Sequence, residues 1–400
     1  MDKSPEVHEV VVIGAGPGGL AIARQLQHEH HREVLIVERA SAPVPTWRAR
    51  YDNFRLNTSG FWSHLPGQRI PLRAGRWPSR DAIVRYFDDY VQRQHLRLRL
   101  ECEVERVDRV GEEWQLQTSG GVIRARAVVL ACGNYRTPNL PEWPGFDGFT
   151  GEFVHSMDFR NAWPYRDRST LVVGAANSAA DIAVQLVNAG ASRVLLSVRT
   201  PPHLVRRAFG PFPLDLLLVA LGRKPASVVD PLIDRWTRAT VGDLSAYGFK
   251  HPEMGLKATV EQRGRIPTFA DELIAEVRAG KIEVVSAVEG FDGKHVLLAD
   301  GTSMDPDVVV AATGFSSDLS GLVGHLGVLN ARGKPGSGYA TDCGDGLYSI
   351  GYGEPFTGPL RQFRKSAPEL AKRISQHLNI TPRRNHVAVL PQEITHAGNH

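Results

Sequence analysis

The amino-acid sequence predicts an α/β fold with two Rossmann-like domains, each followed by a β-meander. Two observations support this prediction. An apolar strand, a glycine-rich turn, a helical repeat and a second apolar strand succeed one another at residues 10–38, and the same order returns at residues 169–199. A strand-rich segment with a small hairpin turn, Gly120-Gly121 in one case and Asp300-Gly301 in the other, follows each unit.

Composition is that of a globular chain with enough material for two domains. The 400 residues include 42% hydrophobic and 22% charged residues, and the formal net charge is +4. Arginines alternate with acidic residues, as in RLRLECEVERVDR, and do not form a stripe interleaved with aromatic residues. We therefore expect a small-molecule partner and no nucleic acid.

The sequence also limits the compartment and excludes a metal centre. Cys102, Cys132 and Cys343 lie far apart without a C-x-x-C pair, which is typical of a reducing compartment. The first residues contain no apolar leader, and LDLLLVALG is too short to span a bilayer. The HEHH run at residues 28–31 is expected at a solvated helix end. These observations predict a cytoplasmic protein with no membrane span and no metal, and they leave a homodimer open.

The first glycine-rich turn, GAGPGG, lies between a strand and a helix, where a G-x-G-x-x-G loop binds a pyrophosphate. The helix N-terminus favours the phosphate charge. Glu38 ends the next strand, where a carboxylate accepts hydrogen bonds from both ribose hydroxyls and repels a 2′-phosphate. The loop therefore predicts FAD or NAD. Its candidate cofactor-binding residues are Gly14, Gly16, Gly18, Gly19, Glu38 and Arg39.

The second turn, GAANSA, differs from the first at two positions. Ala176 occupies the second glycine position, where its methyl group lies on the expected path of the pyrophosphate. Arg199 follows the next strand where the first unit has Glu38, and a guanidinium there can pair with a 2′-phosphate. This contrast assigns NADPH to the second site; a solvated strand-end arginine is the alternative. The candidate residues of this site are Gly174, Asn177, Ser178, Ala179, Arg199 and Thr200.

The order of these units predicts a discontinuous first domain. We expect FAD-binding residues 1–152, an NADPH-binding domain at 153–309 with a helical cover, and a return to the FAD-binding domain at 310–400. The last segment should contain a return strand, the strand GLYSIGY and a closing helix from about Leu360.

Three stretches together resemble the class B flavin-containing monooxygenases. FTGEFVHSMDF matches the fingerprint F-x-G-x-x-x-H-x-x-x-[F/Y], with Phe149, Gly151, His155 and Phe159 at its fixed positions. VVGAANSAADIA is similar to the NADPH loop of that family, and VVVAATGF is similar to its return strand. Further stretches, GRIPTF, VRAGKIEVV and GLYSIGY, resemble the plant YUCCA-type branch and its bacterial relatives.

The resemblance implies FAD, NADPH and O2 as reactants. In that family NADPH reduces the flavin, and oxygen adds at flavin C4a to give a hydroperoxide that transfers one oxygen atom to a small organic substrate. The adduct must be shielded from water and proton donors, and the oxygen chemistry belongs to the cofactor. We therefore expect a flavoprotein oxidoreductase without a catalytic triad.

The resemblance also assigns residues around the flavin. RLNTSG is similar to a segment whose asparagine lies beside the reactive face of the flavin, so Asn57 is the catalytic candidate; an Asn-Thr turn is the alternative. Trp47 matches a family tryptophan, although Val44-Pro45-Thr46 replaces the usual Gly-Gly ahead of it. The closing helix could direct its N-terminus at the flavin. Thr58, Gly314 and Gly351 complete the cofactor-binding candidates.

His155 is expected to have an architectural role, because a proton donor would discharge the hydroperoxide. In this interpretation Gly151 permits a tight bend, Phe149 and Phe159 anchor it, and His155 holds the interdomain crossing near NADP⁺.

The substrate is left open by the sequence. The apolar face of the cover, with Leu216, Leu217, Val219 and Leu221, is expected either to line the substrate route or to pack in the core. Oxygenation of soft nitrogen or sulfur and oxidative decarboxylation of a 2-oxo acid both fit the family. Phe159 resembles the nitrogen and sulfur oxygenases more than the ketone-oxygenating, Baeyer-Villiger group. An NADPH-flavin oxidase or reductase that releases peroxide is a further alternative, as is a nucleotide-binding protein without turnover.

Overall fold

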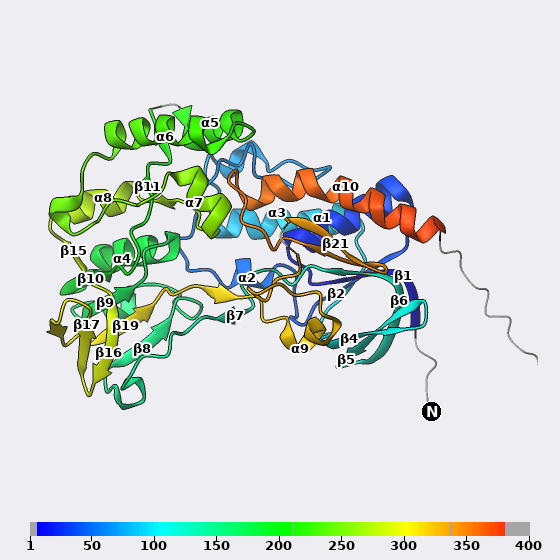
Figure 1. Cartoon of the computed structure of the whole chain (residues 1–400), viewed down its shortest axis with the longest axis horizontal. Coiled ribbons are helices and arrows are strands. Elements are labelled where there is room, and N and C mark those ends of the chain that lie inside the picture. Colours follow the sequence, from blue (N-terminus) through cyan, green and yellow to red (C-terminus); the bar gives the residue numbers. More distant parts are fainter. Residues whose placement is uncertain (1–5, 211, 337, 381–400) are drawn as a thin grey trace, which may run out of the picture.

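The computed structural model describes residues 6–210, 212–336 and 338–380. Two α/β halves lie side by side along the long axis of the molecule, with the helices α5 to α8 over one half and the long helix α10 over the other (Figure 1). The α/β fold with two Rossmann-like halves, each with a β-meander, is therefore confirmed. Among the described residues, no helix is both long and apolar enough to cross a membrane.

The first half is built on one sheet, whose central strands are parallel, whereas one edge strand and the two meander strands pair in antiparallel fashion. The central strand β1 ends in an apolar run, with Val10, Val11 and Val12 fully buried between covering layers. The spatial order is β21 (Ala340–Gly344), β22 (Leu347–Ile350), β6 (Gly121–Leu130), β1 (Glu6–Ile13), β2 (Val34–Val37) and β3 (Leu98–Arg99). The predicted first meander is β4 (Val104–Val110) and β5 (Glu113–Thr118), which joins β6 in antiparallel pairing.

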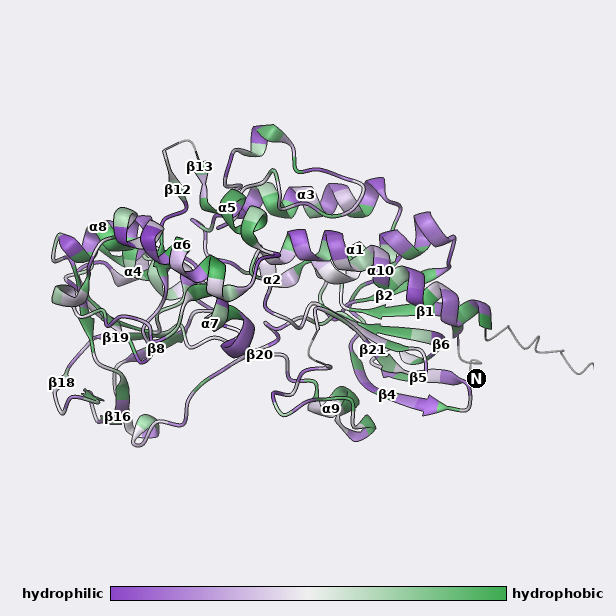
Figure 2. Ribbon diagram, turned by 45° about the horizontal axis from the view of Figure 1, so that its top comes forward, coloured by the Kyte–Doolittle hydropathy of each residue, from purple (hydrophilic) through white to green (hydrophobic). Residues whose placement is uncertain are grey.

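Helices cover one face of this sheet, and their apolar sides face it (Figure 2). Ser79 caps the longest of the early helices by accepting a hydrogen bond from the backbone N–H of Ala82 (3.4 Å). The helices are α1 (Pro17–Arg24), α2 (Pro45–Arg48), α3 (Arg80–Arg93) and α10 (Pro359–Ile380). The expected closing helix is thus present, while residues 381–400 of the expected last segment lie outside the described residues.

The second half has a five-stranded sheet that is parallel throughout. Its spatial order is β15 (Ile282–Val285), β10 (Arg193–Ser197), β9 (Ser169–Val173), β19 (Val308–Ala311) and β8 (Glu152–His155). The helices α4 (Asn177–Ala189) and α8 (Asp271–Arg278) pack on one face. The second meander forms a separate antiparallel sheet that packs on the opposite face: β16 (Val288–Asp292), β17 (His295–Leu298) and β18 (Ser303–Met304).

The predicted helical cover is present between these strands. It comprises α5 (Leu214–Leu221), α6 (Ala226–Thr240) and α7 (Leu256–Arg263). One short strand pair joins the segment that enters the cover to the segment that leaves it: β11 (Leu204–Val205) with β14 (Thr268–Phe269). A second pair, β12 (Ala208–Phe209) with β13 (Phe212–Pro213), forms a hairpin directly before α5. From α5, Asp215 and Leu218 line the large cavity between the two halves, and the four expected leucine and valine positions do not. Leu217 and Leu221 pack in the core of the cover, and Leu216 is exposed.

The chain crosses between the halves twice, and the two crossings are hydrogen-bonded to each other. They form the antiparallel pair β7 (Thr137–Pro138) and β20 (Phe315–Ser316). The expected domain boundaries at 152/153 and 309/310 need correction, because each cuts through a strand of the second sheet, β8 in one case and β19 in the other. The return to the first half follows β19, so this strand belongs to the second half.

The remaining short elements lie on the connections. They are the π-helical turn Gln25–Glu29 after α1, the helix α9 (Ser320–Val323), and 3₁₀ turns at Leu72–Ala74, Phe146–Gly148, Trp163–Tyr165, Ser245–Tyr247 and Gly324–Leu326.

Candidate functional site

A cavity of about 400 Å³ lies between the two halves and is lined by residues from both glycine-rich loops, both crossings and the cover. Twelve of the predicted cofactor residues line it: Gly14, Gly16, Gly18, Glu38, Arg39, Trp47, Asn57, Thr58, Asn177, Ser178, Gly314 and Gly351. Five do not: Gly19, Gly174, Ala179, Arg199 and Thr200. The fingerprint residues 149, 151, 155 and 159 also lie outside its lining.

The first loop is packed too closely for side chains at two of its glycines. Gly14 has φ of 107°, and a Cβ there would lie 2.7 Å from the carbonyl oxygen of Ala131. A Cβ on Gly19 would lie 2.0 Å from the carbonyl oxygen of Gly14, so this glycine lets helix and strand approach. Gly16 differs, because its backbone is extended and it faces the cavity. The loop therefore leaves bare backbone where a pyrophosphate would bind.

Glu38 is fixed in place by the backbone around it. Its carboxylate accepts hydrogen bonds from the N–H groups of Ala15 (2.9 Å) and Ala40 (3.0 Å), and the residue is only 7% exposed. Because each carboxylate oxygen retains a free lone pair and the side chain lines the cavity, Glu38 can still accept from ribose hydroxyls. Bare loop and acid together fit the adenosine and pyrophosphate of FAD.

The second loop has the same geometry at its first glycine. Gly174 has φ of 133°, and a Cβ there would lie 2.5 Å from the carbonyl oxygen of Ala312. Ala176 precedes α4 with φ −86° and ψ −178°, close to the φ −72° and ψ 174° of Gly16 before α1. An alanine meets no backbone strain in this extended conformation. Its effect is confined to the methyl group on the cavity wall.

Asn177 has a structural partner that the sequence did not indicate. Its Nδ2 donates to the carbonyl of Pro267 (3.0 Å), and its Oδ1 accepts from the N–H of Phe269 (2.9 Å). The hydroxyl of Thr268 donates to the carbonyl of Ala175 (2.8 Å). The side chain therefore pins the GRIPTF segment to the loop, and only the backbone and Ser178 stay available to a nucleotide.

Arg199 lies two residues beyond the end of β10 and is exposed. Val198 and not Arg199 corresponds in place to Glu38, because the first glycine of each loop donates to the last strand residue, Val37 in one half and Ser197 in the other. Arg199 does not line the cavity. Its pairing with a 2′-phosphate stays a prediction.

Trp47 reaches the cavity from α2 and packs edge-on against Phe54 and Phe87, with ring centroids 5.9 and 5.6 Å away. Val44, just before this helix, is buried and left-handed, with φ of 52°. Glycine adopts this backbone conformation without cost. The structure thus retains the turn although the usual glycines are absent.

The histidine fingerprint holds the crossing into the second half. His155 ends β8 and is 5% exposed; its Nδ1 accepts from the N–H of Met157 (3.1 Å), so the neutral ring carries its proton on Nε2. Burial lowers the pKa of His155, while the nearby Gly314 carbonyl and Asp158 raise it. The ring is therefore neutral near pH 7 and does not face the cavity.

Two details of the fingerprint differ from the expectation. Gly151 does not have a left-handed backbone; its missing side chain leaves room for the ring of Phe149, whose Cζ would lie 2.4 Å from a Cβ. Phe159 is 1% exposed and stacks on Tyr165 at 5.7 Å, inside the core of the second half. It lies too deep to select a substrate directly.

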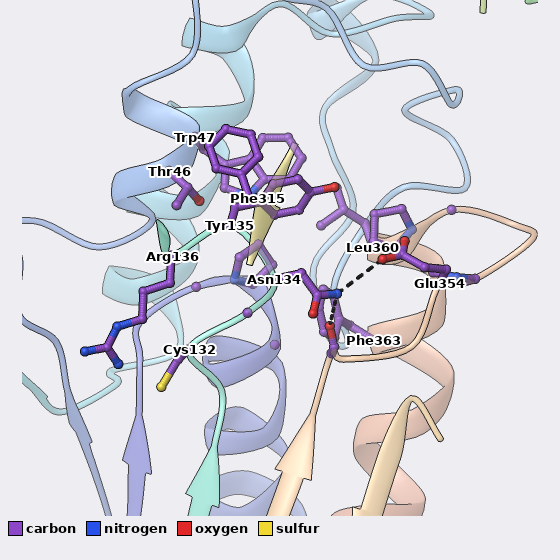
Figure 3. A pocket seen from close by; sticks show the side chains of 18 of the residues that line it. Thr46, Trp47, Cys132, Asn134, Tyr135, Arg136, Phe315, Glu354, Leu360 and Phe363 are labelled. Carbon is purple, nitrogen blue, oxygen red and sulfur yellow. Dashed lines mark hydrogen bonds between the residues drawn. The ribbon is translucent and has the colours of Figure 1, made fainter. Parts of the chain in front are cut away.

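Several cavity residues were not predicted, among them a half-buried polar group beside the first loop. Figure 3 shows Asn134 pointing toward Glu354, with the rings of Tyr135 and Phe315 close together behind it. Nδ2 of Asn134 donates to the carbonyl of Gly351 (3.3 Å) and to Glu354 (3.4 Å). Burial raises the pKa of Glu354, and Lys334, 3.7 Å from its carboxylate, lowers it. Asn134, Phe315 and Glu354 directly follow Gly133, Gly314 and Gly353, and these glycines were the available sequence signal.

Comparison with known proteins identifies the family. The family model described as flavin-binding monooxygenase-like matches residues 110–326, and the model described as pyridine nucleotide-disulphide oxidoreductase matches residues 11–206. The probable indole-3-pyruvate monooxygenase YUCCA10 of Arabidopsis thaliana is 30% identical over 324 residues, covering 78% of this chain and 82% of the relative. YUCCA8 of the same plant is 28% identical, with 86% and 84% covered.

A solved structure agrees with these matches at the level of the fold. The flavin-containing monooxygenase from Stenotrophomonas maltophilia superposes with a TM-score of 0.71 at 20% identity, over 93% of this chain and 99% of that chain. The chain therefore belongs to the flavin-binding monooxygenase-like family and is a flavin-dependent oxidoreductase.

Proposed function

We propose that this protein is an NADPH- and O2-dependent FAD monooxygenase that transfers one oxygen atom to a small organic substrate. One observation supports this most: a single cavity is lined by both the first loop, at Gly14 and Gly16, and the second loop, at Asn177 and Ser178. Two dinucleotides bound at these loops would meet in one enclosed volume. Bound flavin supplies the redox and oxygen chemistry.

The residues of the chain position the reactants and exclude water. The first loop and Glu38 hold the FAD adenosine and pyrophosphate, while the N-terminus of α4 and Arg199 hold NADPH. Leu218, Phe315 and Phe356 give the cavity an apolar wall. The neutral His155 lies outside the lining, so it offers no proton to a reacting group in the cavity. Asn57 is the polar group that we propose beside the reactive face of the flavin.

The relatives place 2-oxo acids first among the substrates to test, because YUCCA8 and YUCCA10 are named indole-3-pyruvate monooxygenases. Amines and sulfides remain candidates, and so do ketones for Baeyer-Villiger oxygenation. The alternative of an oxidase that releases peroxide is favoured by one observation, the Ala176 methyl group on the cavity wall, since a loosely held NADP⁺ would shield the flavin poorly.

The test is reduction of the FAD-loaded protein with NADPH under anaerobic conditions, followed by mixing with ¹⁸O2 and a panel of 2-oxo acids, amines, sulfides and ketones. One ¹⁸O atom in a product, with NADPH use that depends on that substrate, is the expected result. Stoichiometric peroxide with every substrate would establish the oxidase instead. A protein that binds FAD but is not reduced by NADPH would contradict both.

A further inference from the structure

The cover of the second half contacts the proposed catalytic asparagine directly. The segment between β11 and α5 extends to the first half, where Nη2 of Arg207 donates a hydrogen bond to Oδ1 of Asn57 at 3.0 Å. The two residues are 150 positions apart in the sequence. Arg207 itself is absent from the lining of the main cavity, whereas Asn57 belongs to it.

This contact determines which end of the asparagine amide faces Arg207. A guanidinium has only hydrogen-bond donors, so its partner must be the carbonyl oxygen of the amide and cannot be the NH2 group. The amide is planar, and Nδ2 is consequently directed away from Arg207. We propose that Arg207 is a positioning residue that holds Asn57 with its N–H donors available to the cavity. This inference rests on the proposed function, in which Asn57 lies beside the flavin.

Arg207 is itself held from two sides by carboxylates of the second half. Its backbone N–H donates to Asp271 (2.9 Å), and its Nη2 lies 3.7 Å from Oδ1 of Asp181. The other oxygen of Asp181 accepts a hydrogen bond from the hydroxyl of Tyr51 (2.5 Å), which belongs to the first half. Tyr51, Asp181, Arg207 and Asn57 therefore form a continuous polar chain that begins and ends in the first half.

This chain runs beside a second, polar cavity of about 310 Å³, which Asp181 and Arg207 line. Arg207 thus lines the polar cavity, while its hydrogen-bond partner Asn57 lines the main cavity.

A second contact from the same segment fixes the backbone next to Asn57. Asp215, at the start of α5, is 2% exposed, and its Oδ2 accepts hydrogen bonds from the N–H and the hydroxyl of Ser59, both at 2.7 Å. Arg207 and Asp215 therefore hold alternate residues of one loop. The donor geometry at Asn57 depends on the cover being docked, which links the arrangement of the two halves to the reactivity of the site.

The test compares Arg207→Met with Arg206→Met in the FAD-loaded full-length protein. Arg206 is a matched control, because it is adjacent in sequence and its Nε donates to the carbonyl of Thr240 (2.7 Å), away from Asn57. With NADPH and oxygen as the only reactants, we expect Arg207→Met to raise peroxide release about tenfold. The change in the visible flavin spectrum on titration with NADP⁺ should shrink in the same variant. Arg207→Lys, which keeps one cation and its donors, should recover part of both signals.

A double-mutant cycle separates positioning from a general structural role. If Arg207 acts through Asn57, then Arg207→Met adds less than about twofold to peroxide release in an Asn57→Ala background. Full additivity, or equal behaviour of Arg207→Met and Arg206→Met, would overturn the inference. If the wild-type protein is not reduced by NADPH, the proposed function fails. The same double-mutant cycle, measured by thermal unfolding, then tests the hydrogen bond between Arg207 and Asn57. Non-additive changes in Tm support this bond, and additive changes reject it.

Discussion

The imidazole ring of His155 lies edge-on to the ring of Phe315, with the centroids 5.1 Å apart and the planes at 85°. His155 ends the strand by which the chain enters the second sheet, and Phe315 begins the crossing by which it leaves. Phe315 also lines the main cavity. The histidine therefore supports a cavity wall from behind and does not act inside the cavity.

Replacing His155 by alanine should loosen this wall. We expect His155→Ala to raise the KM for NADPH and the share of electrons lost as peroxide, each about tenfold, because an aromatic pair and its packing are removed next to NADP⁺. His155→Phe retains the ring contact and should stay within about threefold of wild type. Steady-state NADPH oxidation with peroxide detection measures both. Normal coupling and an unchanged KM in the alanine variant would refute the supporting role.

The pH dependence of stability should report the buried state of His155. Its pKa in the folded protein lies below the usual 6.5, so between these two values the unfolded chain binds more protons. The contribution of the neutral ring is present above pH 6.5 and is lost as the pH falls through the folded-state pKa. Urea unfolding at a series of pH values should therefore show wild type losing stability relative to His155→Phe on acidification. His64 and His203, which have lowered pKa values too, are unchanged in this comparison.

Glu38 should control the affinity for FAD. In Glu38→Gln, the amide NH2 would face one of the two backbone N–H groups that now donate to the carboxylate, and the charge-assisted bonds to the ribose are lost. We expect the Kd for FAD to rise about 10- to 100-fold, as measured by quenching of flavin fluorescence in the apoprotein. Glu105→Gln, at an exposed position on β4, is the control and should bind FAD as wild type does. Equal affinity in the two variants would contradict the assignment.

Arg199 should determine the preference of the protein for NADPH over NADH. Removal of its guanidinium in Arg199→Ala costs the charge-assisted hydrogen bonds to a 2′-phosphate, so we expect kcat/KM for NADPH to fall about 10- to 100-fold while the value for NADH hardly changes. Flavin reduction in a stopped-flow instrument with each nucleotide gives the ratio. An equal fall in kcat/KM for both nucleotides would show that Arg199 acts on the loop as a whole and does not bind the 2′-phosphate.

The second loop offers a matched pair of single-methyl changes. Gly174→Ala would place Cβ 2.5 Å from a backbone oxygen at a left-handed φ, and should lower the free energy of unfolding by about 2–4 kcal/mol. Ala176→Gly removes a methyl group from the cavity wall, and should tighten NADP⁺ binding and reduce peroxide release with little change in stability. Thermal unfolding and NADP⁺ titration test the two changes. Weaker binding in Ala176→Gly would show that the methyl group does not obstruct the nucleotide.

The sequence predicted those parts of the fold that depend on residues close together in the chain. The two strand–loop–helix units follow from glycines whose missing side chains are needed for close packing. The contrast of Glu38 with Arg199 also comes from a local pattern, although Glu38 follows its strand directly and Arg199 lies one residue further on. Asn57 was found because a short family segment surrounds it. Residues that follow a glycine at the end of a strand, such as Asn134 and Phe315, carried the same kind of signal but were not recognised.

Other features depend on contacts that no local pattern specifies. The bond from Arg207 to Asn57 joins positions 150 residues apart, and nothing near Arg207 distinguishes it from Arg206. The reason for glycine at position 151 is the ring of Phe149, which returns over it. The domain boundaries were misplaced because β8 and β19 pair with each other in the second sheet, which only the assembled sheet shows.

The strands β7 and β20, one from each crossing between the halves, are paired with each other by backbone hydrogen bonds. Two unpaired connections could move independently of each other, whereas two hydrogen-bonded strands move as one unit. A change in the relative orientation of the halves would therefore act on both crossings together. Since Phe315 belongs both to this strand pair and to the wall of the main cavity, such a change would also alter the shape of that wall.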